Sequence, residues 1–555
     1  MITPDKEPPP LFRHQQELFD QTRDAVAWAV LFEQGLGKTA PTIRTVEHLY
    51  RQNRIDGAVV VAPNGVHRNW ISDELPRHAG MPWRGMDWHS DRGKGQDKAL
   101  ERLFAPTPPG RRTELTWLAI TYEGMLTPRG RAALLKFKER FPRFLLVIDE
   151  ASKVRNPEAL RTKKVDALRQ FASHVRLLNG TPIGNSALDI YAQMKLLDNR
   201  FWIRQGIGSW TAFKAQFAIM RRIPVGGEDD RVGRGKYSHE PIVPHDATED
   251  GIAAYEQLDF SEILEPDEVK QISRPATAAS VPKATIGRTI EVVVGFRELD
   301  KLKAMIAPVS TRLTKEDAGV ELPPKLYSRL LFDLPTEQRR VYDQLRREYM
   351  VELDAGALIT APLALVRILR LQQIACGYLP NPDDPENPKL FYDDDGKNAR
   401  LRLLLERLED TPHQAIIWAR FTHDVDLICR ALGPPKCTRY DGLVSQKERD
   451  AGLDQFKQGK KKFCVAKAAS MGMGLSLPMA KSVYYYSNTF SYIERLQSED
   501  RAHRLVGGGM GAVCYYDITA YKTVDEKILH SLQDCQDVAN RITGDRYRAW
   551  LTEET

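Results

Sequence analysis

Long apolar runs are missing from this 555-residue sequence. No stretch approaches the ~20 apolar residues that a membrane-spanning helix requires. The first ten residues, MITPDKEPPP, also lack the features of a signal peptide. We therefore expect a soluble, intracellular protein without a membrane partner, located in the cytoplasm, or in the host cytoplasm if the protein is viral.

Cysteine is scarce, and the six cysteines include no CxxC pair and no zinc-type spacing. This pattern is typical of a reducing compartment, and we interpret the thiols as structural. Charge of one sign is not in large excess either, because 80 Lys and Arg face 74 Asp and Glu. The mildly basic balance permits a nucleic-acid partner without requiring one. The length allows about three or four domains of ~150 residues.

The chain does contain one stretch around which the rest can be arranged, FEQGLGKT at residues 32–39. It follows Ala25–Phe32, a short apolar run that predicts a strand buried on both faces. It precedes a helical pattern with Pro41 in its first turn, where a missing N–H costs least. Phe32 stands where the usual phosphate-loop pattern, GxxxxGK[ST], has its first glycine. An ordinary strand-to-helix turn is the alternative interpretation.

The residue types in this stretch suit a polyphosphate. Gly35, Leu36 and Gly37 form a turn whose backbone N–H groups can point inward. Lys38 supplies a mobile ammonium group for the β and γ phosphates, and the Thr39 hydroxyl can hold Mg²⁺. Residues 35–39 are therefore predicted to bind a nucleoside triphosphate with its Mg²⁺.

Two carboxylates end a second apolar run, Leu145–Glu150 (LLVIDE). Open α/β sheets place their ligands at the carboxyl ends of strands. Asp149 can therefore share the Mg²⁺ with Thr39, usually through water, and Glu150 can orient and deprotonate the attacking water. A helix N-cap with an acidic first turn is the alternative.

A helical pattern that opens at Leu11 carries Arg13 and Gln15, about twenty residues before the phosphate loop. A glutamine side chain can pair with both the N6 donor and the N7 acceptor of adenine. We therefore include Arg13 and Gln15 among the candidate nucleotide-binding residues. An isolated glutamine is more often a solvated surface residue, and that interpretation stays open.

Further short apolar runs end in polar or glycine-rich turns. They are Gly57–Pro63, Thr116–Thr121 and the run that ends in Asn179–Asn185 (NGTPIGN). A Gly-Thr-Pro turn can also simply connect two secondary-structure elements without a binding role. Together with the two runs above, these strand ends predict one nucleotide-binding lobe of the α/β class.

We divide the chain into three parts. Residues 1–335 form an N-terminal lobe, with an inserted element at about 221–288 where a basic stretch precedes an acidic one. Residues 336–395 form a helical linker. Residues 396–555 form a C-terminal lobe with bracing helices at its end. The insertion is the expected site for a protein partner.

The C-terminal lobe contains no phosphate loop of its own, but it carries QSEDRAHR at residues 497–504. Arg501 and Arg504 are three residues apart and fall on one face of a helix. Two arginines on one face can clamp a transferring γ-phosphoryl group if this lobe closes over the first. We include Gln497 with them as candidate catalytic residues. A surface helix with salt-bridging arginines is the alternative.

The motifs, taken in order, resemble those of the Swi/Snf-like branch of the superfamily-two helicases. The resemblance covers nearly the whole chain and is carried by RHQ, GLGKT, VVVAPNGVHRNW, ITYEGM, LLVIDEASKVRNP, LLNGTPIGNS, LPPK, YDGLVSQKERDAGLDQF, GMGLSL, QSEDRAHR and TVDEKIL. DEAS stands where relatives carry DEAH. Other departures are Phe490–Tyr492, Met471, Ser476 and Leu505–Gly507, most of them on the DNA-facing or lobe-coupling side.

The resemblance implies two RecA-like lobes that use ATP and Mg²⁺ and track along duplex DNA. It implies that Gln15 reads adenine, that Asp149 and Glu150 serve metal and water, and that Arg501 and Arg504 act as arginine fingers. It also implies backbone contacts with DNA at or near Asn64, Thr121, Phe421 and Gly474. The chain ends some fifty residues after the arginine box, which suggests a compact, monomeric motor of the phage or bacterial type.

Three function classes stay open at this point. The first is an ATPase that tracks along duplex or branched DNA. The second is a helicase that separates strands of DNA or RNA, or migrates branches during replication or recombination. The third is an ATP-dependent switch that clamps nucleic acid without moving. The sequence shows no wedge hairpin, which disfavours the second class, and Lys38, Glu150, Arg501 and Arg504 together disfavour the third.

Overall fold

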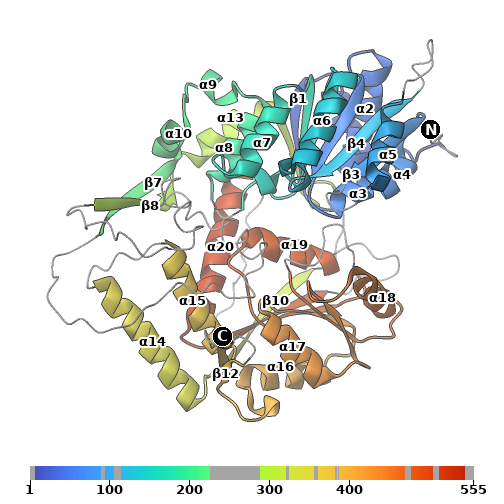
Figure 1. Ribbon diagram of the computed structural model, residues 1–555. Coiled ribbons are helices and arrows are strands. Elements are labelled where there is room, and N and C mark those ends of the chain that lie inside the picture. Colours follow the sequence, from blue (N-terminus) through green and yellow to red (C-terminus); the bar gives the residue numbers. More distant parts are fainter. Residues whose placement is uncertain are drawn as a thin grey trace.

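The structure is a computed structural model of the chain, shown in Figure 1. It describes residues 7–88, 94–105, 114–184, 186–225, 288–319, 324–354, 361–381, 384, 387–468, 477–503 and 512–543. Nearly all of the insertion expected at 221–288 lies outside the described residues. So do Gly474, Arg504, Met471, Ser476 and Leu505–Gly507.

The first sheet has seven parallel strands in the order β3-β4-β2-β5-β6-β1-β9. The strands are β1 (Ala27–Phe32), β2 (Gly57–Ala62), β3 (Trp83–Trp88), β4 (Leu115–Thr121), β5 (Phe144–Asp149), β6 (His174–Leu178) and β9 (Ser310–Leu313). Successive residues of one strand enter two different cores. Val30 packs in one core, for example, and Leu31 in the other. Both faces are therefore covered, which explains why the central strands are continuous apolar runs.

Helices supply the other half of each core. On one face, α1 (Arg13–Thr22) contributes Leu18, and α2 (Thr39–Arg51) contributes Ile43 and Val46. On the opposite face lie α6 (Pro128–Arg140), α7 (Leu160–Arg169) and α8 (Asp189–Leu197). Smaller elements of this lobe are α3 (Val66–Asn69), η1 (Trp70–Glu74), α4 (Leu75–His78), α5 (Lys94–Leu103), η2 (Gly124–Leu126), η3 (Ala151–Val154), α9 (Phe201–Arg204), α10 (Trp210–Phe217), α13 (Leu299–Ile306) and η4 (Ala307–Val309).

The second sheet has six parallel strands in the order β10-β17-β16-β13-β15-β14. They are β10 (Lys325–Phe332), β13 (Ala415–Trp418), β14 (Cys437–Tyr440), β15 (Phe463–Ala466), β16 (Ser482–Tyr485) and β17 (Val513–Ala520). Two cores again lie on its two faces. The arrangement confirms the expected α/β class with two RecA-like lobes. Strand β10 belongs to this sheet although it precedes residue 335, because its pairing partner β17 comes almost at the end of the chain.

Helices α16 (Ala399–Glu409), α17 (Thr422–Leu432), α18 (Gln446–Lys457) and α19 (Tyr492–Ala502) accompany the second sheet. After β10, and before the other strands of the second sheet, the chain forms α14 (Thr336–Asp354), α15 (Ala361–Ala375), the short pair β11 (Tyr378–Leu379) and β12 (Lys389–Leu390), and η5 (Asp395–Lys397). An antiparallel pair, β7 (Ala218–Val225) and β8 (Arg288–Phe296), projects from the first lobe (Figure 1). Strand β7 overlaps residues 221–225, where the sequence pattern showed no element.

The last described helix, α20 (Val524–Thr543), runs from the second lobe toward the first and packs on α15 and on α13 of the first lobe (Figure 1). Buried Arg400 anchors its start. The guanidinium pairs with Asp525 and donates to the carbonyl oxygens of Tyr486 at 2.5 Å and Ile518 at 3.1 Å. One side chain therefore joins two strand ends to α20, and α20 joins the two lobes.

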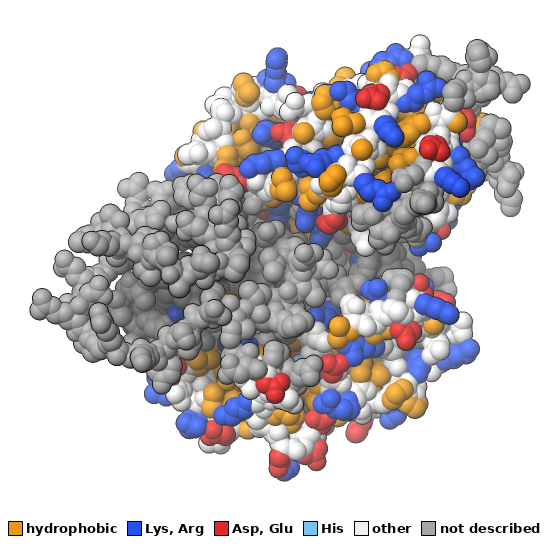
Figure 2. Space-filling model, in the orientation of Figure 1, with side chains coloured by type: hydrophobic (Ala, Val, Ile, Leu, Met, Phe, Trp, Pro, Cys, Tyr) orange, Lys and Arg blue, Asp and Glu red, His pale blue; other side chains and the backbone are white. Residues whose placement is uncertain are grey.

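The described surface carries mixed charge. Lys and Arg side chains are interspersed with Asp, Glu and apolar side chains on both lobes in Figure 2, in keeping with the small net positive charge. Among the described residues, no helix has the length and apolarity needed to cross a bilayer.

Candidate nucleotide site

The phosphate-loop stretch connects β1 to α2 as predicted. Gly35 and Gly37 have φ of 91° and 71°, a region that suits glycine. At Gly37 the space is also closed, because an added Cβ would lie 2.2 Å from Nε2 of Gln15. The loop therefore depends on glycine at Gly37 for both its conformation and its packing.

Lys38 lies just before the first residue of α2, Thr39. Its Nζ donates to the carbonyl oxygen of Phe32 at 3.1 Å, which holds the ammonium group against the end of β1. Burial lowers the pKa of Lys38, while the charges of Glu150 and Asp149 oppose that shift. The loop lysine and the acidic pair, more than a hundred residues apart in sequence, thus belong to one electrostatic site.

Asp149 is the last residue of β5, and both of its carboxylate oxygens accept hydrogen bonds. Oδ2 accepts from Nε1 of Trp70 at 2.8 Å, and Oδ1 accepts from the backbone N–H of Glu150 at 2.9 Å. The hydroxyl of Tyr122 donates to the backbone carbonyl of Asp149 at 2.8 Å. Burial raises the pKa of Asp149, against the Trp70 hydrogen bond and the charge of Lys38.

Glu150 has a left-handed backbone, with φ of 51°, a conformation that costs a non-glycine residue energy and is common at functional sites. Its side chain is 9 % exposed, and Oε2 has no hydrogen-bond partner among the described residues. Burial raises the pKa of Glu150, while Lys38 opposes the shift, Asp149 adds to it, and Arg501 opposes it further. A buried carboxylate oxygen without a partner is costly unless a water or ligand occupies the space beside it.

The turn after β6 packs against the phosphate loop. An added Cβ at Gly180 would lie 2.9 Å from Cγ of Gln34 and 3.4 Å from Nζ of Lys38. The turn is itself fixed, because Oδ1 of Asn179 accepts from the N–H of Thr181 at 3.0 Å. The Gly-Thr-Pro turn thus borders the site directly.

Residues of β9 and the segment after it also reach the loop, although the sequence patterns gave them no role. Nη1 of Arg312 donates to the carbonyl of Leu31 at 2.7 Å. The backbone N–H of Lys315 donates to Oε2 of Glu33 at 2.7 Å. No local pattern marks these two residues, because their neighbours in space are set by the position of β9 at the edge of the sheet beside β1.

Gln15 and Arg13 occupy different environments. Gln15 is buried, and its Nε2 donates to the carbonyls of Leu36 and Gly37 at 3.3 and 3.1 Å, while Oε1 accepts from the N–H of Phe12 at 3.0 Å. Arg13 is exposed and pairs with Glu17 on the outer side of α1. The structure therefore brings Gln15 to the phosphate loop and leaves Arg13 at the surface.

The second lobe contributes α19, which carries Gln497 and Arg501. Arg501 is 2 % exposed and lies near enough to Glu150 for its charge to act on the pKa of that carboxyl; Gln497 is partly exposed on the same helix. The lobes pack closely here, because an added Cβ at Gly184 would lie 2.6 Å from Cδ1 of Ile493. The structure thus brings Arg501 into the neighbourhood of Glu150, whereas Arg504 lies outside the described residues.

Two ion pairs hold α19, one to the segment that follows β9 of the first lobe and one to β10 of its own lobe. Nζ of Lys315 lies 3.0 Å from Asp500, and Nζ of Lys325 lies 2.8 Å from Glu499. Burial acts to raise the pKa of Asp500, but Lys315 and Lys325 outweigh it and hold that pKa below its ordinary value. Because Lys315 also bonds Glu33, one residue links the phosphate-loop segment to the arginine helix.

The candidate DNA contacts fall in three different settings. Asn64 is exposed just after β2, and Thr121 ends the neighbouring strand β4, where its Oγ1 accepts from the N–H of Gly124 at 2.8 Å. Since β2 and β4 pair in parallel, both residues lie at one edge of the first sheet. The side chain of Phe421 is instead 7 % exposed and packs on Tyr378. Gly474 lies outside the described residues.

The donor set suits Mg²⁺ brought in by a nucleotide. Among the described residues, no cluster of three or more His, Cys, Asp or Glu could hold a metal. Thr39 and Asp149 offer hard oxygen donors, and Mg²⁺ usually binds through one or two carboxylates together with substrate phosphates. A site of this kind needs the phosphates to complete it.

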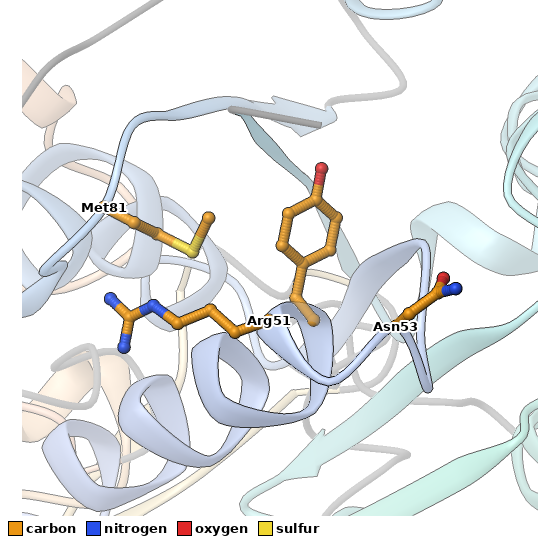
Figure 3. A pocket seen from close by; sticks show the side chains of 4 residues that line it. Arg51, Asn53 and Met81 are labelled. Atoms are coloured by element: carbon orange, nitrogen blue, oxygen red, sulfur yellow. The ribbon is translucent and has the colours of Figure 1, made fainter. Parts of the chain in front are cut away.

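A small pocket of about 180 Å³ lies elsewhere, lined by Tyr50, Arg51, Asn53 and Met81. Figure 3 shows Arg51 and Asn53 at the carboxyl end of α2 with Met81 opposite. The phosphate loop is at the other end of that helix, about 20 Å away at ~1.5 Å per residue. This pocket is therefore separate from the candidate nucleotide site.

Comparison with known proteins finds two family models along the chain. An SNF2-related domain matches residues 29–241, and a helicase conserved C-terminal domain matches residues 396–506. Similar curated proteins include Protein CHROMATIN REMODELING 4 of Arabidopsis thaliana, 23 % identical over 94 % of this chain and 20 % of that protein. The human Lymphoid-specific helicase is 21 % identical over 90 % of this chain and 58 % of its own length.

A solved structure, the Sulfolobus solfataricus SWI2/SNF2 ATPase core in complex with dsDNA, is 20 % identical, with a TM-score of 0.36 and coverage of 98 % of this chain and 95 % of that chain. The chain spans 20 %, 39 % and 36 % of the length of three curated relatives that it matches.

Proposed function

Because this chain belongs to the Swi/Snf-like branch of the superfamily-two helicases and is a nucleic-acid-dependent ATPase, we propose that it is a motor that tracks along duplex DNA. It hydrolyses ATP to ADP and phosphate between its two lobes. The observation that carries this proposal is that α19 of the second lobe packs on the first lobe at Gly184 and carries buried Arg501 near enough for its charge to oppose the raised pKa of Glu150.

The triphosphate binds at residues 35–39, where Lys38 neutralises charge on the β and γ phosphates. Thr39 and Asp149 would hold the Mg²⁺, which supplies further charge neutralisation when it is bound. The approach of Gly180 to Lys38 and the hydrogen bonds from Gln15 to the loop support this assignment, because they fix the loop before nucleotide arrives. A preformed loop avoids the cost of ordering it on binding.

Glu150 orients the attacking water and takes its proton as the water oxygen bonds to the γ-phosphorus and the bond from that phosphorus to the β–γ bridging oxygen breaks, which releases ADP. Its buried Oε2, which has no hydrogen-bond partner within the described part of the chain, supports this role, because one water molecule there would satisfy that oxygen. A pKa raised by burial brings the carboxyl nearer to neutral pH, which suits a general base.

Arg501, with Arg504 and Gln497, completes the site from the second lobe. The guanidinium groups stabilise the charge that develops on the γ-phosphoryl group. Since α19 is also held by Lys315, which follows β9 of the first lobe, hydrolysis depends on how the lobes meet. Lobe closure is thereby coupled to turnover.

DNA lies across the carboxyl edge of the first sheet and contacts both lobes. Asn64 and Thr121 lie at this edge, and in the second lobe the backbone near Phe421 and Gly474 provides the matching contacts. The side chain of Phe421 packs inside its lobe, so the contact there is made by the backbone or by neighbours. Backbone contacts suit a motor that grips DNA regardless of sequence.

The ATPase rate in the presence of different nucleic acids tests this function. The rate is measured without nucleic acid and with single-stranded DNA, duplex DNA or RNA, using wild type and Lys38→Ala. Duplex DNA is expected to stimulate wild type most and to leave Lys38→Ala inactive. Equal stimulation by every nucleic acid, or none by duplex DNA, would overturn the assignment.

A further inference from the structure

The carboxylate of Asp149 is fixed by a residue to which the sequence patterns gave no separate role, Trp70. Nε1 donates to Oδ2 at 2.8 Å, while the N–H of Glu150 donates to Oδ1 at 2.9 Å. Trp70 and Asp149 are 1 % and 7 % exposed. One donor on each oxygen sets the plane of the carboxylate and leaves lone pairs for water or a metal.

Trp70 begins an uncommon turn. The five residues Trp70–Glu74 form the π-helical turn η1, in which the N–H of Leu75 donates to the carbonyl of Trp70. Turns of this kind are rare and occur frequently at functional sites. Glu74 lies at the other end of η1. Burial raises the pKa of its carboxyl, and the charge of Asp149 raises it further.

The indole of Trp70 rests on a second buried indole, Trp117 of β4, with a distance of 6.1 Å between ring centroids. Both rings lie in the same core, and each is 1 % exposed. Nε1 of Trp117, however, has no hydrogen-bond partner in the part of the chain that the structure describes. The two residues therefore form a matched pair that differs in the bond to Asp149.

The segment that carries Trp70 also has an exposed side. Asn64, Gly65 and Arg68 are exposed, and they stand between the end of β2 and η1. Helix α3 continues directly into η1, so the exposed turn and Trp70 belong to one continuous segment. The segment is thus exposed at its start and in contact with Asp149 at its end.

We propose that Trp70 is a positioning residue that holds Asp149 for the Mg²⁺–nucleotide and connects it to the exposed turn 64–68, so that duplex DNA at this turn strengthens Mg²⁺–nucleotide binding. The inference rests on the function proposed above and adds a route for its DNA dependence. Because binding couplings are reciprocal, Mg²⁺–nucleotide strengthens DNA binding by the same factor.

The first test measures binding rather than turnover. The affinity for a fluorescent, non-hydrolysable ATP analogue is measured with Mg²⁺ and with EDTA, for wild type, Trp70→Phe and Trp117→Phe. Mutation of a residue that orients a metal ligand typically lowers the affinity for the metal by about 10- to 100-fold. Trp70→Phe is therefore expected to lose at least about 10-fold of the Mg²⁺-dependent affinity while its affinity in EDTA stays unchanged, and Trp117→Phe is expected to match wild type.

The second test follows the indole itself. In protein labelled with ¹⁵N-tryptophan, the indole N–H signal of Trp70 is assigned by its loss in Trp70→Phe. It is expected to shift when duplex DNA is added without nucleotide and again when the Mg²⁺–analogue is added. Circular dichroism and the melting temperature report folding. If Trp70→Phe is unfolded, replacement of Trp70 by 3-benzothienylalanine, with sulfur in place of N–H, decides the question.

Equal Mg²⁺ dependence in Trp70→Phe and Trp117→Phe, with wild-type ATPase stimulated by duplex DNA, overturns the role of Trp70 and leaves the proposed function intact. If duplex DNA leaves the chemical shift of the Trp70 indole N–H unchanged, the connection to the exposed turn is overturned. A wild type that binds the analogue but gains no ATPase rate from duplex DNA overturns the proposed function instead.

Discussion

Gln15 gives the sharpest prediction at the nucleotide site, because sequence and structure suggest different roles for it. The sequence analysis and the resemblance both suggest that Gln15 reads adenine. In the structure its amide group is occupied, with Nε2 on the carbonyls of Leu36 and Gly37 and Oε1 on the N–H of Phe12. We therefore expect Gln15→Ala to weaken the phosphate loop, which is common to every nucleoside triphosphate.

The magnitude follows from the two hydrogen bonds to the loop. Each is worth about 0.5–1.5 kcal/mol net, so their loss costs about 1–3 kcal/mol, or roughly 5- to 150-fold in affinity. The assay is equilibrium binding of fluorescent ATP and GTP analogues. If these bonds stabilise the loop, both affinities fall together. The ratio of the ATP and GTP affinities should then change by less than about twofold.

Gln16→Ala is the matched control. Gln16 is the next residue on α1, exposed, with its amide on Oδ2 of Asp20 at 3.0 Å. Its replacement should leave both affinities unchanged. A Gln15→Ala protein that retains its GTP affinity and loses only its preference for ATP would refute the reasoning and restore the adenine-reading role.

Three further predictions follow from the same site and from the second lobe. Glu150→Gln should bind ATP normally and lose about 10²- to 10⁴-fold in steady-state turnover, the range for a general base; near-normal turnover would contradict its role. Arg501→Ala should lose about 10³- to 10⁵-fold in turnover while ATP affinity stays within a few-fold; a large loss of affinity with unchanged maximal rate would contradict the arginine-finger role. Burial raises the pKa of Asp424 to about 7, against hydrogen bonding from Ser487 and the charge of Arg400. Because the folded state holds this proton more tightly than the unfolded state, the group stabilises the protein as pH falls from 8 to 5, by about 2–3 kcal/mol. Urea unfolding at both pH values should show that Asp424→Asn lacks this gain, and an unchanged pH dependence would contradict it.

The central strands could be predicted from the sequence because both of their faces are buried. Ala25–Phe32, Gly57–Pro63 and Leu145–Glu150 are continuous apolar runs, and they became β1, β2 and β5. Strands with exposed or polar positions were missed. Edge strand β3 reads WRGMDW and short β9 reads STRL, and neither sequence shows an apolar run.

Within the site, the sequence predicts those residues whose roles follow from a motif formed by their neighbours in the sequence. Lys38, Asp149 and Arg501 each stand in such a motif. Arg312 and Lys315 do not, because their roles come from neighbours far along the chain. Trp70 ends the motif VVVAPNGVHRNW, but the motif does not show its hydrogen bond to Asp149, which is 79 residues away. For the same reason the sequence did not predict that β10 belongs to the second sheet. Its pairing partner, β17, lies almost at the end of the chain.

The movement of the protein along closed duplex DNA is the central claim, and a pair of strand-displacement gels tests it most directly. A motor that grips the sugar-phosphate backbone with both lobes should displace the third strand of a triplex with ATP. It should fail to unwind a forked duplex of similar length, and Lys38→Ala should do neither. Efficient ATP-dependent unwinding of the fork, with no displacement of the third strand, would contradict the account.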